Sequence, residues 1–257
     1  MARNFPRLSA NKRRKVLLRQ VKKSVGMFEL FEKGDRIIIG VSGGCDSLIM
    51  TEILADKSSW WSGSVEFFPA HIDPGFSVDE KRISALSKRI GNLGYDLEIV
   101  RAHNIARTAL GEDKPQNPCF ICSRMRRKAL LETAEKLKAN KVALGHHRED
   151  VLETFLINLF WGREIAAMNP NQELFKGKYH IVRPIFLARE SQIKKYAEII
   201  SLPDYSPDCP VAGKTKRDYV KKLLTRLERE NPGLKRNMFR ALFHPKPDYL
   251  LERYRKE

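Results

Sequence analysis

The stretch Arg36-Ile-Ile-Ile-Gly-Val-Ser-Gly-Gly-Cys-Asp-Ser47 decides the fold. Its first half, residues 36–41, is short, apolar and rich in β-branched side chains, which is typical of a buried parallel strand. The turn at residues 42–44 ends this strand, and a helix is expected from about Asp46 to Ala55. Where a strand passes into a helix, backbone N–H groups and the helix dipole together form a site for an anion.

The loop between this strand and its helix is a candidate phosphate site. Gly43 and Gly44 let the backbone approach phosphate oxygens without a Cβ in the way, and the hydroxyls of Ser42 and Ser47 can donate hydrogen bonds. Asp46 could hold Mg²⁺ beside the phosphates or cap the helix. The Walker A pattern is absent. Spacing alone leaves a phosphate loop and a tight, capped turn equally open.

Strand and helix patterns alternate beyond this loop. Apolar, β-branched runs predict strands at residues 65–72, 97–100 and 142–144. Between and after them, apolar residues at helical spacing predict helices at residues 79–93, 122–139 and 150–160. This alternation predicts an α/β fold with a doubly wound, mostly parallel sheet and helices on both faces. Ligands in such folds bind beyond the carboxyl ends of the strands, where the candidate motifs of this chain fall.

The chain is expected to form one large core with helical flanks. Its 257 residues, 42% of them apolar, suffice for one such core. We expect a basic N-terminal helical segment at residues 1–32, the catalytic core at 33–190, and a basic helical segment at 191–257 packed on that core.

The formal charge of +17 belongs to the ends of the chain. Residues 1–25 carry nine Lys or Arg and no acid, residues 213–257 carry fourteen against six, and the middle carries 25 of each sign. Basic arms on a neutral body favour a polyanionic partner such as nucleic acid, although such runs also occur on ordinary solvated helix faces. No apolar run is long enough for a membrane span, and residues 1–15 lack the apolar stretch of a signal peptide, so we expect no membrane association and a cytoplasmic protein.

The cysteines allow three interpretations. Cys119 and Cys122 form a C-x-x-C pair at the start of a basic helix, where the helix dipole lowers thiol pKa values, and Cys45 and Cys209 lie elsewhere. A redox pair needs only the first two, whereas a structural zinc site needs four ligands. Three thiolates, with Cys209 as the third, suit a [4Fe-4S] cluster with one open iron. The residues alone leave cluster, zinc and redox pair equally open.

Two motifs resemble those of a known superfamily. Ser-Gly-Gly-x-Asp-Ser at residues 42–47 resembles the signature of the PP-loop ATP pyrophosphatases, and residues 145–150 resemble the G-H-x-x-D-D segment of PP-loop enzymes acting on tRNA. Asp73 lies where such enzymes contact the nucleotide. The resemblance implies that ATP is bound by Ser42, Gly43, Gly44, Cys45, Asp46, Ser47, Asp73, Gly145, His146 and Asp150.

A closer resemblance runs from about Asn11 to Phe243. The pattern C-x-x-C-S-R-x-R-R from Cys119, G-H-H-x-x-D from Gly145, residues 181–184 and Cys209-Pro210 are together similar to the tRNA-cytidine 2-sulfurtransferase family. This implies that Cys119, Cys122 and Cys209 hold a [4Fe-4S] cluster and act in catalysis with Asp46. One departure is Cys45, which stands where thiolating members usually carry Lys.

The resemblance implies ATP-dependent thiolation of tRNA. Mg-ATP would adenylate a base carbonyl oxygen, O2 of an anticodon-loop cytidine above all, and sulfur would replace that oxygen. A cysteine desulfurase persulfide or free sulfide would supply the sulfur, and a homodimer is possible. A different nucleoside, such as a uridine, and a non-catalytic metal-bearing tRNA-binding protein are the alternatives. The expected tRNA contacts are Arg13, Arg14, Arg124, Arg126, Arg127, Lys216 and Arg217.

Overall fold

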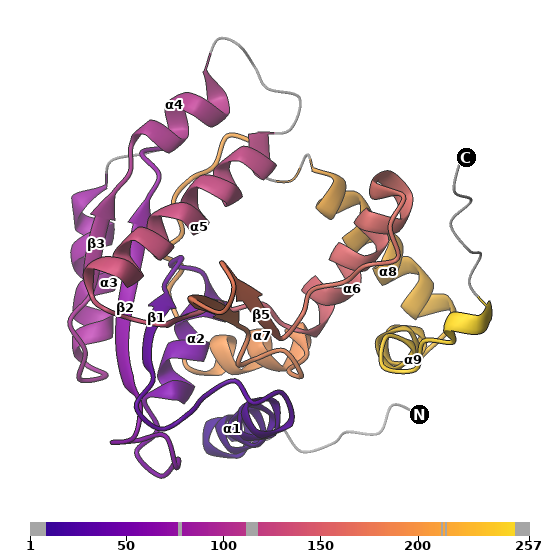
Figure 1. Cartoon of the computed structure of the whole chain (residues 1–257), viewed down its shortest axis with the longest axis horizontal. Coiled ribbons are helices and arrows are strands. Elements are labelled where there is room, and N and C mark those ends of the chain that lie inside the picture. The colour runs from indigo at the N-terminus through magenta and orange to yellow at the C-terminus, as the bar shows by residue number, and fades with distance from the viewer. Residues whose placement is uncertain (1–8, 77–78, 112–117, 212, 214, 250–257) are drawn as a thin grey trace. The chain divides into compact units, whose positions relative to one another are not determined.

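The fold is built on one mostly parallel sheet (Figure 1). The computed structural model describes residues 9–76, 79–111, 118–211, 213 and 215–249. The strand order is β3-β2-β1-β4-β6-β5, and only β5 runs antiparallel to its neighbour. The strands span Arg36–Gly40 (β1), Glu66–Asp73 (β2), Glu98–Arg101 (β3), Lys141–Ala143 (β4), Asn171–Leu174 (β5) and Tyr179–Val182 (β6).

Both faces of the sheet are buried, which explains the continuous apolar run of β1. Ile37 and Ile39 point into one hydrophobic cluster and Ile38 into the other, because successive side chains of a strand alternate between its faces. All three side chains are fully buried. A strand with only one covered face would alternate apolar and polar residues instead.

Helices cover the two faces as a doubly wound fold requires (Figure 1). The cluster around Ile37 and Ile39 is closed by α1 (Ala10–Met27), α2 (Cys45–Leu54), α3 (Glu80–Gly91) and α7 (Glu190–Ile199). The cluster around Ile38 is closed by α4 (Asn104–Leu110) and α5 (Pro118–Lys136). The doubly wound sheet predicted from the sequence is confirmed.

The sheet changes winding direction at β1. The chain passes from β1 outward to β2 and β3, and then returns to place β4 on the other side of β1. Loops that leave the carboxyl ends of β1 and β4 therefore diverge, and the crevice between them is where such sheets bind ligands. Residues 42–47 follow β1 and residues 145–147 follow β4.

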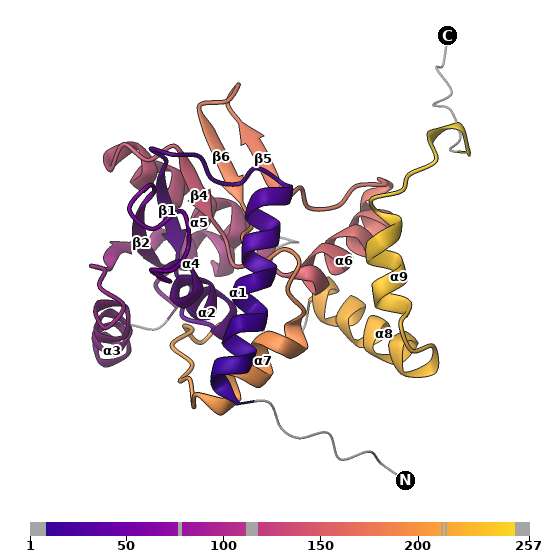
Figure 2. The same cartoon turned by 90° about the horizontal axis from the view of Figure 1, so that it is seen from below.

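The chain divides into two compact units. Unit 1, residues 1–148 and 169–215, contains the sheet with α1 and α7; unit 2 comprises residues 149–168 and 216–257. The described part of unit 2 is mostly helical, with α6 (Arg148–Ile157), α8 (Lys216–Glu230) and α9 (Leu234–Ala241), which Figure 2 labels. A π-helical turn (Asn158–Gly162) follows α6, and a 3-10 turn (Pro247–Tyr249) lies beyond α9. The three-segment division expected from the sequence stays a prediction. Nowhere in the described ranges is a helix both long and apolar enough to cross a membrane.

Two features have no counterpart in the sequence prediction. These are helix α4 and the β5–β6 hairpin. In addition, the helix expected over residues 150–160 ends in a π-helical turn. The hairpin turns through Phe175, Lys176 and Gly177, all with positive φ. The loop between the strands contains Gly177, a weaker hairpin signal than a two-residue Asn-Gly or Asp-Gly turn.

A buried ion pair fixes the start of β4. Lys141 Nζ lies 2.7 Å from Asp35 Oδ2, and both side chains are about 5% exposed or less. Asp35 also accepts hydrogen bonds from the Asn140 side chain at 2.7 Å and from the Glu32 backbone N–H at 2.6 Å. The carboxylate is therefore fully partnered inside the protein, and it depends on the lysine for charge balance.

Replacing Lys141 with Met is expected to lower the free energy of unfolding by about 3–5 kcal/mol, because the Asp35 carboxylate would stay buried without its cation. Urea unfolding followed by circular dichroism measures this loss. Lys136→Met is the matched control, since its ion pair with Glu98 is exposed and should contribute about 1 kcal/mol or less. Equal losses in the two variants would contradict the account of the buried pair.

Candidate functional site

The phosphate loop is closed by its own serines. Helix α2 begins at Cys45 with Gly44 as its N-cap, so the first backbone N–H groups of the helix face the loop. The Ser47 hydroxyl accepts a hydrogen bond from the Ser42 backbone N–H at 3.1 Å and donates one to the Gly44 carbonyl at 3.0 Å. The Ser42 hydroxyl lies 3.1 Å from that of Ser47. These bonds hold the loop in one curved conformation, as an anion cradle requires.

Two other segments press directly against this loop. Gly43 has φ +92°, and a Cβ there would lie 2.4 Å from the Tyr205 carbonyl oxygen. The Tyr205 backbone N–H donates to the Gly43 carbonyl at 3.0 Å. On the β4 side, a Cβ on Gly145 would lie 3.1 Å from the backbone of Ser47. Both glycines are therefore required by close backbone approach.

Cys45 is an unreactive thiol in this setting. Burial, followed by the neighbouring Asp46 carboxylate, raises its pKa to about 11. Its Sγ–H donates to Asp46 Oδ1 at 3.6 Å. A thiol with this pKa stays protonated near neutral pH, so it does not supply the thiolate that nucleophilic attack or metal binding needs.

Asp46 has a histidine neighbour that the sequence did not single out. His147 Nε2 lies 3.9 Å from Asp46 Oδ1, and the His147 side chain is 5% exposed. His147 follows β4, whereas Asp46 belongs to the first turn of α2. The carboxyl ends of β1 and β4 thus bring an acid and an imidazole together beside the phosphate loop.

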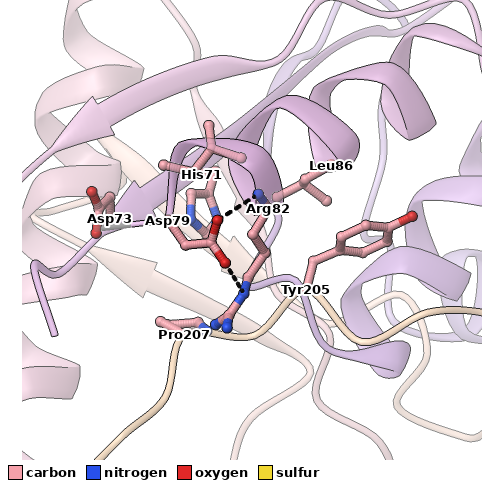
Figure 3. A pocket seen from close by; sticks show the side chains of 8 residues that line it. His71, Asp73, Asp79, Arg82, Leu86, Tyr205 and Pro207 are labelled. Carbon is pink, nitrogen blue, oxygen red and sulfur yellow. Dashed lines mark hydrogen bonds and ion pairs between the residues drawn. The ribbon is translucent and has the colours of Figure 1, made fainter. Parts of the chain in front are cut away.

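A pocket beyond the carboxyl end of β2 adjoins this loop (Figure 3). Its lining includes Asp73 and His71 from β2 and Tyr205, whose backbone binds Gly43. Asp73 is nearly buried; it accepts a hydrogen bond from the Gly75 N–H at 2.9 Å, and His103 Nε2 lies 3.0 Å from its other oxygen. The Asp73 carboxylate is therefore held in one orientation.

His71 is neutral in this pocket. Its Nδ1 lies 2.8 Å from the Val41 carbonyl oxygen and so carries the hydrogen that it donates there. Burial lowers its pKa, against the opposing effect of that hydrogen bond. The side chain therefore ties the end of β2 to the end of β1 without adding charge.

Three thiols line a second cavity, of about 150 Å³. Cys119 and Cys122 enter it from the first turn of α5, and Cys209 enters from the Pro-rich segment after α7, residues 202–211. Burial raises the pKa of Cys122, and the Arg126 guanidinium, which also lines the cavity, acts in the opposite direction. Cysteines 87 positions apart in the sequence thus meet in one partly enclosed space.

No three His, Cys, Asp or Glu side chains within the described ranges are grouped closely enough to hold a single metal ion. The ligands of a four-iron cluster bind different irons, so they need to surround a volume rather than meet at one point. A cavity lined by three thiols meets that requirement.

The segment 202–211 joins the phosphate loop to the thiol cavity. Its Tyr205 contacts Gly43, and Cys209 follows four positions later. Arg82 of α3 holds the part between them: its guanidinium donates to the Ser206 carbonyl at 2.6 Å and to Asp208 Oδ2 at 3.0 Å. One short stretch of chain therefore spans both halves of the candidate site.

Comparison with known proteins assigns the family. A PP-loop domain model matches residues 13–226. A tRNA-cytidine(32) 2-sulfurtransferase of Methylobacillus flagellatus is 33% identical over 98% of this chain and 84% of its own length, and one of Geobacter sulfurreducens is 35% identical over 94% of each. The chain belongs to the tRNA-cytidine 2-sulfurtransferases of the PP-loop family. Members of this family are transferases.

A solved structure supports the same fold. The U34-tRNA thiolase NcsA of Methanococcus maripaludis, solved with its [4Fe-4S] cluster, superposes with a TM-score of 0.73 over 91% of this chain and 79% of that one. At 22% identity, this likeness shows that the two chains share one fold.

The structure brings most of the predicted ATP-binding residues of this family together. The loop from Ser42 to Ser47 and Gly145 are in direct contact, and His146 follows Gly145. Asp73 lines the adjoining pocket. Asp150 instead belongs to unit 2, where its carboxylate accepts a hydrogen bond from Arg217 at 2.9 Å.

The residues predicted to bind tRNA fall into two groups. Arg14 and Arg217 form internal ion pairs, Arg14 with Asp56 at 2.7 Å and Arg217 with Asp150. The second group differs in exposure: Arg13 is partly buried, Arg126 lines the thiol cavity, and the exposed members are Arg124, Arg127 and Lys216.

Four further residues of the site were assigned no role from the sequence. Arg82, Tyr205, His103 and His147 each act through a partner far away in the chain. His147 lies within the quoted G-H-H motif but was not assigned a role, and Tyr205 lies in a Pro-rich stretch without periodicity. Only the tertiary structure shows these contacts.

Replacing Gly43 with Ala should abolish nucleotide binding by this PP-loop enzyme, because the new Cβ would displace Tyr205 and distort the cradle. The strain of positive φ alone costs about 1–2 kcal/mol. Gly63→Ala is the matched control: Gly63 has φ +78° but nothing within 4 Å of an added Cβ. Calorimetric titration with ATP measures binding, and loss of binding in both variants would contradict the steric argument.

Replacing Arg82 with Ala should loosen the segment that carries Cys209. We expect Cys209 in the metal-free protein to react several-fold faster with a maleimide, measured by mass spectrometry of its peptide, because two hydrogen bonds to that segment are removed. Arg89→Ala on the same helix is the control, since Arg89 pairs with Glu52. An unchanged Cys209 rate in Arg82→Ala would show that the arginine does not position the segment.

Proposed function

We propose that this chain catalyses ATP-dependent thiolation of tRNA, with O2 of an anticodon-loop cytidine as the oxygen replaced. The observation that carries the proposal is the short segment from Tyr205 to Cys209, which joins the phosphate loop to the thiol cavity. The relatives named tRNA-cytidine(32) 2-sulfurtransferase support the choice of base. Proximity of the activating site to the sulfur-bearing site is what a two-step substitution requires.

The first step activates a poor leaving group. The carbonyl oxygen attacks the α-phosphorus of ATP, the bond from that phosphorus to the bridging oxygen breaks, and pyrophosphate leaves. Backbone N–H groups at the start of α2 and the hydroxyls of Ser42 and Ser47 would stabilise the charge on the phosphates. Asp46 would hold Mg²⁺ there, and Asp73 and His146 would orient the nucleotide.

The second step replaces the activated oxygen. Sulfur forms a bond to the base carbon, the carbon–oxygen bond breaks, and AMP departs with that oxygen. Within the protein, the 202–211 segment keeps Cys209 close to the loop where AMP is formed, and Arg126 adds positive charge at the thiol cavity. Free sulfide would supply sulfur at the oxidation level that this substitution needs. A cysteine desulfurase persulfide would supply it only after a thiol reductant has added two electrons and released the outer sulfur as sulfide.

The thiol cavity fits an iron-sulfur cluster. Its volume of about 150 Å³, its three cysteine thiols and its partial enclosure suit a [4Fe-4S] group held by Cys119, Cys122 and Cys209. With three protein ligands, a bound cluster supplies one iron that is open to a sulfur atom. The cluster of the Methanococcus maripaludis thiolase belongs to that protein, so the proposal for this chain rests on its own cavity.

The remaining parts of the proposal follow from the substrate. An enzyme acting on tRNA is expected in the cytoplasm, and its exposed cations, such as Arg124 and Arg127, would contact phosphates. Thiolation of a uridine by the same chemistry, or tRNA binding without catalysis, would give different outcomes in the experiment below.

Cys209→Ser is expected to lower iron and acid-labile sulfide to background after anaerobic reconstitution, and to abolish formation of thiocytidine. Cys45→Ser is the matched control for the metal analysis alone, and it should keep iron and sulfide, because Cys45 lies in the phosphate loop rather than in the cavity. Iron and sulfide analysis of the purified proteins is combined with mass spectrometry of tRNA nucleosides from a strain lacking the gene, complemented with each variant.

Each result has a distinct meaning. Thiocytidine missing from the deletion strain and restored by the unaltered gene but not by Cys209→Ser, with iron and sulfide retained in Cys45→Ser, would support the full proposal. A missing thiouridine would redirect the substrate, and an unchanged set of nucleosides would refute the sulfurtransferase activity. A Cys209→Ser protein that keeps its iron and its activity would refute the cluster assignment.

A further inference from the structure

Unit 2 carries a cluster of exposed aromatic rings next to a lysine. The rings of Phe160 and Trp161 lie 5.6 Å apart at 76°, and those of Trp161 and Tyr219 lie 5.9 Å apart at 79°. Lys216 Nζ lies 5.2 Å from the centre of the Trp161 ring. We call these four residues the aromatic step.

The rings of the aromatic step are open to solvent. Phe160, Trp161 and Tyr219 are 47%, 42% and 59% exposed. Aromatic rings that pack edge-to-face inside a protein core have their other faces covered by neighbouring side chains. The faces of these three rings are instead partly exposed to solvent. Leu159 and Ile165, close by in the sequence, are exposed as well, so this part of unit 2 carries more than a single exposed apolar side chain.

The backbone that presents these rings is held firmly. Phe160 and Trp161 belong to the π-helical turn Asn158–Gly162, which Arg163 closes in a left-handed conformation, with its N–H bonded to the Asn158 carbonyl. The Asn158 side chain donates to the Ala166 carbonyl at 2.9 Å and ties down the loop that follows. A π-helical turn inside a helix is a common mark of a functional position.

The surrounding charge favours a polyanion. Helix α8, which carries Lys216 and Tyr219, has six basic and three acidic residues, and α9 has three basic residues and no acid. Arg217 is neutralised by Asp150 and Glu153, whereas Lys216 lies exposed against the Trp161 ring. Cations interleaved with exposed rings are the arrangement by which proteins hold unpaired nucleotides, with phosphates on the cations and bases on the rings.

We propose that the aromatic step is a stacking platform for an unpaired base of RNA. An unpaired loop offers the flat faces of its bases, whereas a continuous duplex keeps them stacked on one another. A second copy of this chain is the less favoured occupant, because two basic surfaces would repel each other. The inference deepens the proposed function, since the nucleotide concerned would be one of the unpaired loop that carries the modified base.

The test compares two RNAs and two exposed tryptophans. Binding of the full-length protein to an RNA hairpin with an unpaired loop, and to a blunt RNA duplex of equal length, is measured by fluorescence anisotropy at fixed salt. Trp161→Leu keeps apolar bulk but removes the ring. Trp60→Leu is the matched control, because Trp60 is 51% exposed and packs edge-on against Trp61, in unit 1.

We expect Trp161→Leu to weaken hairpin binding between about fivefold and about a hundredfold and to leave duplex binding unchanged, as loss of one stacked base predicts. Quenching of tryptophan fluorescence by the hairpin should disappear in Trp161→Leu and persist in Trp60→Leu. Lys216→Gln should weaken binding of both RNAs equally, because it removes a phosphate contact. Tyr219→Leu provides a second ring variant at a more exposed position.

Unchanged hairpin affinity in both Trp161→Leu and Tyr219→Leu would overturn the inference. So would an equal loss for hairpin and duplex, or a shift from dimer to monomer in sedimentation without loss of hairpin binding, which would make the surface an interface between copies. Because these measurements need no ATP, cluster or sulfur, failure of the proposed thiolation would leave their outcome readable, and the converse also holds.

Discussion

The close approach of two backbones, at Gly43 and Tyr205, is the constraint on which the candidate site depends. The contact leaves no room for a Cβ at position 43, and it includes a hydrogen bond from the Tyr205 N–H to the Gly43 carbonyl. It also fixes the 202–211 segment at the carboxyl ends of β1 and β2, from where that segment reaches the start of α5. Together with the hydrogen bonds of Arg82 to Ser206 and Asp208, this contact defines where Cys209 lies relative to the phosphate loop.

The topology of the sheet makes this contact possible. Helix α5, with Cys119 and Cys122, covers the face that buries Ile38, whereas α7 covers the opposite face. The chain that leaves α7 must pass around the sheet to reach the start of α5. It passes the carboxyl ends of the strands, where the β1 loop lies. The doubly wound fold thus lets the 202–211 segment contribute to both the nucleotide half and the thiol half of the site.

Much of the fold was predictable because its signals are local. Period and β-branching marked β1 to β4, and glycines with serines marked the phosphate loop. The thiol cavity was predictable only in part, since no spacing rule joins Cys209 to a pair 87 residues earlier. Arg82 and Tyr205 escaped prediction for the same reason: their partners are set by packing. The β5–β6 hairpin was missed because β5, Asn-Gln-Glu-Leu, has no β-branched or aromatic side chain that would mark it as a strand.

The distribution of charge shows how a sequence count can mislead about RNA contacts. The ends of the chain hold its excess of cations, yet Arg14 and Arg217, one near each end, are committed to carboxylates inside their own units. Such cations stabilise the protein and offer little to a phosphate, because an arginine already paired must give up that pair to bind elsewhere. Affinity for RNA must then come from cations that are not paired with a carboxylate among the described residues, such as Lys216, and from uncharged surfaces, which a count of charges does not register. Exposed rings on a fixed turn are such a surface: they add attraction that salt screens weakly and that distinguishes an unpaired loop from a duplex.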